Sequence, residues 1–354
     1  MIKLSDFVSL IFYIICFIIS SLFYYLYNKN NKKILLFLSL LIPIFIGGFR
    51  YGVGTDFKTY IGLYNIYKNS INIINDSKII ELNFILISII SKYLYGEKSL
   101  FLIYTILTLF FAYKGINTVE KKYRPLAYFI YLFLYFTSSF NGIRQMLAVN
   151  IIFYAVKYIN NKNLYKWTAF VIIAGLTHTT AFIMYPLYFI LSTDKKIFKL
   201  GSVLLMLVVV QNYQYFIGLL ANIEEFDKYA KYTTYNSNFS LNNYNFYLSI
   251  IVLFYFIINY SKLNSKDKNN YNYIILFTFG CIFNLLGFFS PDIKRISTYF
   301  KIFEISLLCQ IPFKQITNRD KVLNLTLVII YSVGSFIIYS YILKHSNIIP
   351  YRWW

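Results

Sequence analysis

The chain has 354 residues, of which 58% are hydrophobic, 21% are aromatic and only 14% are charged. This composition excludes an ordinary water-soluble domain, in which about a quarter of the residues are charged. The formal net charge of +20 does not indicate nucleic acid, because the lysines stand in short loops between apolar segments, where they set membrane topology and meet anionic head groups. We therefore expect an all-α polytopic membrane protein with no nucleic-acid partner.

Neither the cysteines nor the N-terminal segment indicates a secreted, disulfide-rich protein. Cys16, Cys281 and Cys309 lie inside apolar segments without paired spacing, so neither a disulfide framework nor a metal site is expected. No small-residue cleavage site follows a short apolar region here, so the apolar run at residues 8–27 is expected to remain as a membrane span. Because no internal repeat or linker is found, residues 1–354 are expected to form a single integral membrane domain.

The first two apolar runs, residues 8–27 and 34–49, set the predicted orientation. A bilayer core of about 30 Å requires roughly 20 residues of helix. The lysines between these two runs place their loop in the cytoplasm by the positive-inside rule. Residues 50–82 are then expected to form an outer loop, and residues 221–245, which lean acidic, are expected to form a second one.

Two segments have unusual lengths for membrane spans. Residues 83–95 are too short to cross, and a full crossing there would put the basic cluster at residues 121–124 outside, so a re-entrant or interfacial helix is predicted. Residues 167–191 are bounded by lysines on both sides and should cross an even number of times. We predict two short helices that meet at residues 177–180, with His178 at the break.

The remaining apolar runs are expected to cross singly, which gives about 10–12 transmembrane helices with the short ones included. These runs are residues 100–116, 126–140, 146–158, 200–220, 246–260, 273–289, 300–313 and 323–343.

The stretch after the second span has the composition of a site loop. Residues 50–60 read Arg-Tyr-Gly-Val-Gly-Thr-Asp-Phe-Lys-Thr-Tyr. Gly52 and Gly54 allow backbone conformations closed to other residues and a close approach to a ligand, while Arg50 and Asp56 supply charge. The alternative is an interfacial turn whose arginine reaches up to lipid phosphates.

Arginine is rare in this chain and is placed selectively. Only six of the 34 basic residues are arginine, and Arg50, Arg144 and Arg295 each stand where a helix is expected to meet the outer face. Asp56 and Asp292 lie near two of them. The planar guanidinium holds phosphate through two hydrogen bonds, which lysine cannot do. Three such groups on one side predict a site for a lipid-linked pyrophosphate, with interfacial anchoring as the alternative for each arginine singly.

Four stretches in order, within residues 35–300, together resemble the EpsG family of bacterial polysaccharide polymerases, which are Wzy-like. They are residues 50–56, residues 141–145 (Asn-Gly-Ile-Arg-Gln), His178 among threonines, and residues 295–299 (Arg-Ile-Ser-Thr-Tyr). The family's first motif ends on Tyr, whereas this chain has Phe57 and so no hydroxyl there. The residues predicted to bind substrate, from these stretches and their flanks, are Arg50, Tyr51, Gly52, Gly54, Tyr60, Asn141, Arg144, Gln145, Asp292, Arg295 and Tyr299.

The resemblance implies a GT-C-like helical glycosyltransferase at the outer face of the bacterial cytoplasmic membrane. It would polymerise undecaprenyl-pyrophosphate-linked oligosaccharide units, as donor and acceptor, into capsule, exopolysaccharide or O antigen. Membrane lipids surround it, and a chain-length regulator and a flippase are candidate protein partners. Because arginines can neutralise the leaving pyrophosphate, no metal or other cofactor is expected.

Three residues are candidates for the base that accepts the proton of the acceptor hydroxyl. The most effective base titrates near neutrality, as histidine does. We predict His178 as the base, with Asp56 positioning substrate and Glu81 in reserve. The alternatives are a histidine that only packs against a neighbouring threonine, and carboxylates that only neutralise Arg50.

Two other functional classes remain open. A flippase or transporter of the same lipid-linked unit would usually be built from repeated halves around a central cavity, and the chain shows no repeat. A membrane acyltransferase would place its histidine among acidic or amide partners, whereas threonines flank His178.

Overall fold

The computed structural model describes residues 2–69, 82–212, 215, 243–264, 269–288 and 293–354. The regular secondary structure of these residues is helical, apart from one antiparallel pair of two-residue strands, β1 (Ile2–Lys3) and β2 (Arg352–Trp353). Two compact units are distinguished and are described separately: unit 1 is Met1–Lys157, Tyr165–Phe182 and Leu308–Trp354, and unit 2 is Tyr158–Leu164 and Ile183–Leu307. The single domain expected from the sequence stays a prediction.

The first unit contains the N-terminal helices and the last long helix. Its helices are α1 (Asp6–Asn30), α2 (Lys33–Gly48), α3 (Phe57–Tyr67), α4 (Leu82–Lys92), α5 (Glu97–Ile116), α6 (Arg124–Leu134), most of α7 (Ile143–Asn160), α8 (Leu164–Thr177) and α17 (Asn318–Ile337). Those of unit 2 are α9 (Leu187–Leu191), α10 (Lys196–Gln211), α12 (Tyr244–Ile258), α13 (Tyr260–Asn264), α14 (Asn269–Leu285), α15 (Thr298–Lys301) and α16 (Glu304–Leu308).

Helix lengths and surfaces confirm an all-α polytopic membrane protein. Four helices of the described chain are long and apolar enough to cross a bilayer: Asp6–Asn30, Glu97–Ile116, Asn269–Phe288 and Asn318–Ile342. Five shorter apolar helices accompany them. In α12, Ser249, Val252 and Phe256 are buried, while Ile251 and Phe254 on the other side are exposed. A helix with apolar side chains on its exposed face suits a lipid environment rather than water.

A proline inside α2 shows how polar groups join the helices of unit 1. Pro43 has no N–H, so the carbonyl of Ser39, four residues earlier, lacks its usual helical donor. The hydroxyls of Ser20 on α1 and Tyr128 on α6 donate to this carbonyl at 2.6 and 3.0 Å. The three helices are thereby connected by buried hydrogen bonds, which are costly to leave unmade in an apolar interior.

Three lysine-containing segments that connect helices lie together at one end of unit 1. We call them the basic connections. The side-chain amide of Asn28 donates to the carbonyl of Lys121, and Lys121 Nζ donates to Oδ1 of Asn31, both at 3.0 Å. The ring of Tyr123 lies 5.6 Å from that of Phe313, which brings the lysine-containing turn before α17 to the same place. The sequence assigns these connections to one side of the membrane, and they do lie side by side.

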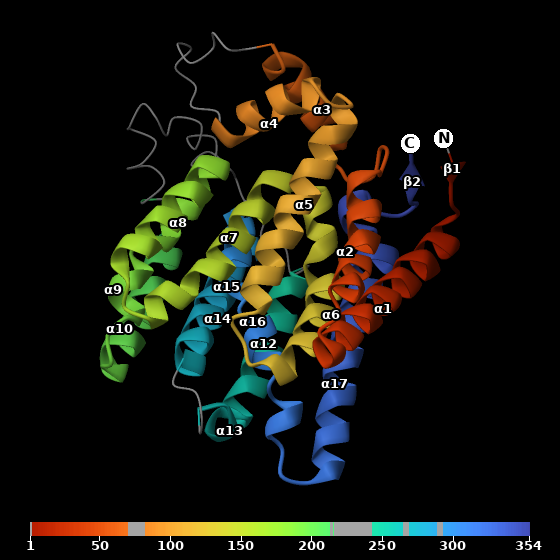
Figure 1. The fold of residues 1–354 in the computed structure, drawn as a ribbon. Helices are drawn as coiled ribbons and strands as arrows, with labels where there is room; N and C mark the ends of the chain where they lie inside the picture. Colours follow the sequence, from red (N-terminus) through yellow and green to blue (C-terminus); the bar gives the residue numbers. More distant parts are fainter. Residues whose placement is uncertain (1, 70–81, 213–214, 216–242, 265–268, 289–292) are drawn as a thin grey trace. The chain divides into compact units, whose positions relative to one another are not determined.

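The other end of α2 carries both strands. Figure 1 shows β1 and β2 close together, away from the turn between α1 and α2, with the marked chain ends beside them. Arg50, two residues after α2, forms a bridge to Trp353. The strands near the two ends of the described chain therefore pair beside the loop that the sequence singles out.

Several predicted spans differ in detail from the observed helices. The expected break at His178 is present, because α8 ends at Thr177 and a 3₁₀ helix (Thr179–Met184) follows. The short helix predicted at 83–95 is α4. The expected outer loop 50–82 contains α3, which the sequence interpretation missed, and the run 300–313 is divided between α15, α16 and a 3₁₀ turn (Pro312–Lys314). The loop predicted at 221–245 lies almost wholly outside the described residues.

Candidate active site

The loop after α2 depends on a glycine with left-handed backbone geometry. Gly54 has φ of +100°, and a Cβ added there would lie 2.6 Å from the carbonyl oxygen of Phe140 and 2.8 Å from Oδ1 of Asn141. Only glycine fits both the dihedral angle and the space. The next backbone N–H, that of Thr55, donates to Oδ1 of Asn141 at 2.7 Å. The first two predicted stretches are thus in direct contact.

The C-terminal segment binds the same loop through its main chain. The N–H of Tyr51 donates to the carbonyl of Arg352 at 2.9 Å, and the N–H of Gly54 donates to that of Asn347 at 3.0 Å. In return the N–H of Trp354 donates to the carbonyl of Phe49 at 3.2 Å. We call residues 347–354 the C-terminal strap. Sequence reasoning missed it, because backbone pairing between residues 300 positions apart leaves no local signal.

A buried tyrosine anchors the strap. Tyr351 is fully buried, its hydroxyl donates to the carbonyl of Ile46 at 3.0 Å, and its N–H donates to Oγ of Ser9 at 2.8 Å. The hydroxyl of Tyr13 donates to the carbonyl of Ile348 at 3.0 Å. The strap is therefore connected to both α1 and α2, and its position fixes that of the loop.

Arg50 lies beneath the loop rather than on it. Its side chain is 1% exposed, and its guanidinium carbon is 4.7 Å from the ring centre of Phe101 and 4.6 Å from that of Phe140. It donates to the carbonyls of Gly47 and Phe140, the first at the C-terminal end of α2, where positive charge is favourable. Burial lowers the pKa of Arg50 to about 10, so it stays protonated at neutral pH.

The alternative in which Asp56 only neutralises Arg50 is not supported, because no ion pair joins these two described residues. Asp56 is half-exposed at the start of α3, and its Oδ1 accepts from the hydroxyl of Thr55 at 3.0 Å. Its backbone carbonyl accepts a hydrogen bond from the N–H of Tyr60, and this bond closes the first turn of α3. Asp56 is consequently available to a ligand, whereas Arg50 is enclosed. Substrate contact by Arg50 stays a prediction.

Arg144 occupies a different environment, in the first turn of α7. Its side chain is half-buried, and its guanidinium carbon is 5.7 Å from the ring centre of Tyr60 on α3 and 5.3 Å from that of Phe84 on α4. Gln145 beside it is also half-buried. Because Asn141, three residues earlier, bonds to Thr55, the polar side chains of this turn contact the chain at both Thr55 and Tyr60.

The helix break at His178 is connected to Arg144 through α4. The side-chain amide of Asn83 donates to Oγ1 of Thr177 at 2.7 Å, and Phe84, the next residue, is the one that contacts Arg144. The N–H of His178 donates to the carbonyl of Ala174 at 2.8 Å, and its side chain is half-buried. Neighbouring residues of α4 therefore contact both the residue before the predicted base and the predicted phosphate-binding arginine.

The comparison with protein families gives one match. The model of the EpsG family matches residues 33–353, nearly the whole chain. The chain belongs to the EpsG family. The matched range includes the Arg50 loop, the Asn141 turn, His178 and most of the strap. Neither the comparison with curated proteins nor that with solved structures gives a match. Membership in the EpsG family indicates a polysaccharide-polymerase type of function.

The other predicted residues of this EpsG-family chain are in unit 2 or outside the described residues. Arg295 is exposed on a 3₁₀ helix (Ile293–Ser297), and Tyr299 is fully buried in α15. Glu81 and Asp292 are not among the described residues. The meeting of Arg295 with Arg144 stays a prediction, since each unit is described by itself.

The described part of this EpsG-family chain gathers donors and aromatic rings rather than metal ligands. Among its described residues, no group of three or more His, Cys, Asp or Glu is placed to hold a metal ion. The predicted site residues of unit 1 that are half-buried include a guanidinium, an imidazole, a carboxylate and two amides, those of Arg144, His178, Asp56, Asn141 and Gln145. Such groups can neutralise a phosphate, accept a proton and hydrogen-bond sugar hydroxyls.

Proposed function

We propose that this protein is a polysaccharide polymerase that joins oligosaccharide units carried on undecaprenyl pyrophosphate, at the outer face of the bacterial cytoplasmic membrane. The observation that carries the proposal is the contact between the family's two polar stretches: the Thr55 N–H bonds to Asn141, and Arg144 follows one turn later over Tyr60. This polar region is at the end of unit 1 away from the basic connections, as an outer-face site requires.

The reaction exchanges one bond at the anomeric carbon. A hydroxyl of the acceptor unit attacks the anomeric carbon of the donor chain, the bond from that carbon to the pyrophosphate oxygen breaks, and the electron pair leaves with the lipid pyrophosphate. The hydroxyl proton passes to a base. Pyrophosphate is stable as an anion, so it needs neutralising cations rather than a proton donor.

Two arginines are assigned to the leaving group. Arg144 is half-buried between aromatic rings, where a guanidinium can hold phosphate through two hydrogen bonds. Arg295 is exposed, and binding of the same group by Arg295 is a prediction from the sequence. Arg50 is assigned a positioning role, because its donors already serve the carbonyls of Gly47 and Phe140.

The proton is assigned to His178, and the acceptor sugar is positioned by Asp56. The break between α8 and the following 3₁₀ helix keeps the imidazole half-buried and out of a regular helical turn. The Asp56 carboxylate is bonded only by its neighbour's hydroxyl among the contacts described, which leaves acceptor positions for sugar hydroxyls. Glu81 is the reserve base.

Analysis of surface glycan from a deletion strain tests the proposal. A polymerase defect removes long polymer and leaves single repeat units on the lipid carrier and at the surface. A flippase defect removes both, because no unit reaches the outer leaflet. Complementation with the wild-type chain should restore polymer, and normal polymer in the deletion strain would contradict the proposal. Capsule, exopolysaccharide and O antigen are the product classes to examine.

A further inference from the structure

Lysines gather at the start of α10 in unit 2, and one of them is buried. We call Lys162, Lys195, Lys196 and Lys199 the lysine cluster. Lys195, Lys196 and Lys199 occupy the first turn of α10 and its N-cap, and Lys199 is only 6% exposed. A helix N-terminus carries partial positive charge, which disfavours cations and favours anions. Three lysines stand at this helix start, and the first turn has no acidic residue to neutralise them. An external anion would supply the missing negative charge.

Neutral amides hold the buried ammonium in place. Lys199 Nζ donates to Oδ1 of Asn272 at 2.5 Å, and Nδ2 of Asn272 donates to Oδ1 of Asn160 at 3.0 Å. The second bond fixes the amide so that its oxygen faces Lys199. An ammonium has three donors, and this network uses one of them without supplying negative charge.

The carboxylate of this region is engaged by another lysine. Asp194 pairs with Lys162 at 2.9 Å, and both side chains are largely exposed. Among the residues the structure describes, none forms an ion pair with Lys199. The lysine cluster therefore has four ammonium groups, one of them buried, for the single carboxylate of Asp194, and this excess of positive charge favours an anion that binds there.

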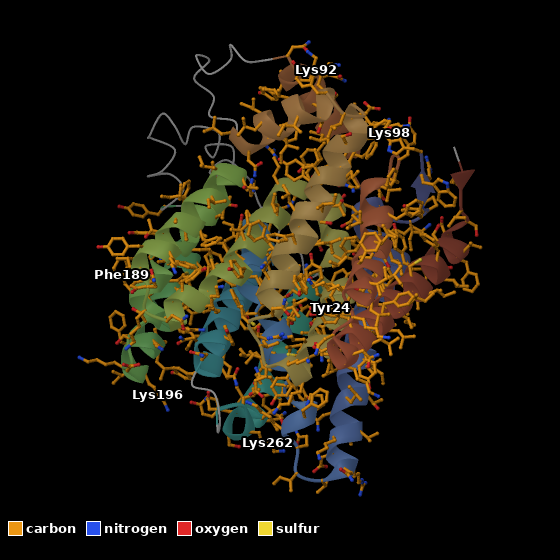
Figure 2. The ribbon with its side chains drawn as sticks, viewed as in Figure 1. Tyr24, Lys92, Lys98, Phe189, Lys196 and Lys262 are labelled. Atoms are coloured by element: carbon orange, nitrogen blue, oxygen red, sulfur yellow. The ribbon has the colours of Figure 1, made fainter. Side chains whose placement is uncertain are left out.

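Two tyrosine rings lie beside the lysine cluster. The Nζ atoms of Lys196 and Lys199 are 5.7 and 5.6 Å from the ring centre of Tyr271, whose ring is 6.3 Å from that of Tyr260. Lys262 follows Tyr260 by two residues on α13. Figure 2 shows Lys196 and Lys262 at the same end of this unit. Tyrosines and lysines together are typical of the head-group level of a membrane.

The neighbouring surface of α10 is apolar and open. Exposed hydrophobic side chains begin in the same turn as the lysines and continue along the helix: Ile197, Phe198, Leu200, Leu204 and Leu205. A soluble phosphate would make no use of this surface, whereas acyl chains would lie along it.

We propose that the lysine cluster binds the phosphate of an anionic phospholipid head group, with the acyl chains along α10. Lys199 and Lys196, whose Nζ atoms both lie near the ring of Tyr271, donate to the phosphate oxygens, and the first-turn N–H groups of α10 add to the attraction. This site is separate from the residues assigned to polymerisation, and it would anchor unit 2 in the leaflet that the lysine cluster faces.

Lipid binding to the purified full-length protein tests the site. Phosphatidylglycerol and phosphatidylcholine are compared by native mass spectrometry or by titration in nanodiscs. The wild type should prefer phosphatidylglycerol. Lys196→Gln, an exposed position, should weaken that binding about five-fold, and Lys199→Met, which keeps an apolar stem, about ten-fold or more. Lys321→Gln, an exposed lysine on α17 of unit 1, should leave it unchanged.

Two results would overturn the inference. Equal binding of the two lipids by the wild type, or wild-type preference in Lys196→Gln and Lys199→Met, would exclude a head-group site. Inorganic phosphate that competes as well as phosphatidylglycerol at equal concentration would show a site for free phosphate instead. If Lys199→Met fails to fold, Lys196→Gln alone decides. The readout is lipid binding, so failure of the proposed polymerase function leaves this test unaffected.

Discussion

Arg50 and Arg144 stand in similar sequence surroundings and in very different structural ones. We call Arg50, Gly54 and the C-terminal strap the enclosed region, and Arg144 and His178 the half-buried region. In the enclosed region, the backbone groups of the loop and the strap pair with each other, and the two terminal nitrogens of Arg50 donate to carbonyls of the protein. In the half-buried region, the Arg144 guanidinium lies against the rings of Tyr60 and Phe84, and the side chains of Arg144 and His178 are both partly exposed.

This difference separates two ways in which a polar residue in a membrane protein serves a site. The enclosed region fixes the shape of the loop, so its substitutions should act mainly on stability and the amount of folded protein. The half-buried region is available to a substrate, so its substitutions should act mainly on rate. The four predictions below, ordered from the largest expected effect to the smallest, test this division.

His178→Ala should lower the rate of unit extension by about 10²–10⁴-fold, the range for loss of a positioned base. Thermal stability should change little, because the side chain is half-buried at a helix break. Extension is measured with purified protein and donor binding is measured separately. If His178→Ala stays within a few-fold of wild type while Asp56→Asn binds donor without extending it, the assignment of the base is reversed.

Gly54→Ala should destabilise the enclosed region by about 1–3 kcal/mol or more, since the added Cβ would lie 2.6 Å from the Phe140 carbonyl at a left-handed backbone position. The measurement is the melting temperature of purified protein in detergent. Gly62→Ala on α3 is the matched control, because nothing lies within 4 Å of its added Cβ. Equal melting temperatures for wild type and Gly54→Ala would show that the loop geometry is not required.

Arg50→Lys should cost about 1–3 kcal/mol of stability, because one ammonium on a shorter reach cannot serve the carbonyls of both Gly47 and Phe140. Activity per folded molecule should fall less than in Arg144→Lys. Melting curves and extension rates normalised to folded protein are compared. A rate loss without a change in melting temperature would move Arg50 into the half-buried region's role.

Tyr351→Phe should have the smallest effect, about 1 kcal/mol of stability, from loss of the hydrogen bond to the Ile46 carbonyl. The ring remains to fill the buried space. Tyr165→Phe removes a hydroxyl from an exposed side chain and is the control. Its melting temperature should equal that of the wild type. Identical melting of Tyr351→Phe and wild type would show that the strap is held without this bond.

The sequence predicted the features that depend on local length and charge. The break at His178 follows from a run too short for two full spans between lysine-rich loops, and α4 follows from an apolar run too short for one. The helix α3 could have been predicted as well. Its buried Tyr60, Tyr64 and Tyr67 recur at helical spacing, but the polar flanks of that stretch favoured a loop.

Features that depend on distant partners could not be predicted. Arg50 is enclosed by the rings of Phe101 and Phe140, and the strap pairs with a loop some 300 residues earlier in the chain. No local pattern distinguishes this arginine from Arg144, because burial is decided by which helix ends meet. The family match covers the strap residues but says nothing about their contacts.

The most direct test of the central claim, that Arg144 binds the leaving pyrophosphate of a polymerisation reaction, is an extension assay with lipid-linked units extracted from the deletion strain. Product length is followed over time with purified wild-type, Arg144→Lys and Arg319→Lys proteins, the last altered at an exposed arginine of α17. The account predicts that wild type and Arg319→Lys extend the units equally, and that Arg144→Lys is slower by about 10²-fold. Extension by Arg144→Lys at the wild-type rate, or no extension by the wild type, would contradict it.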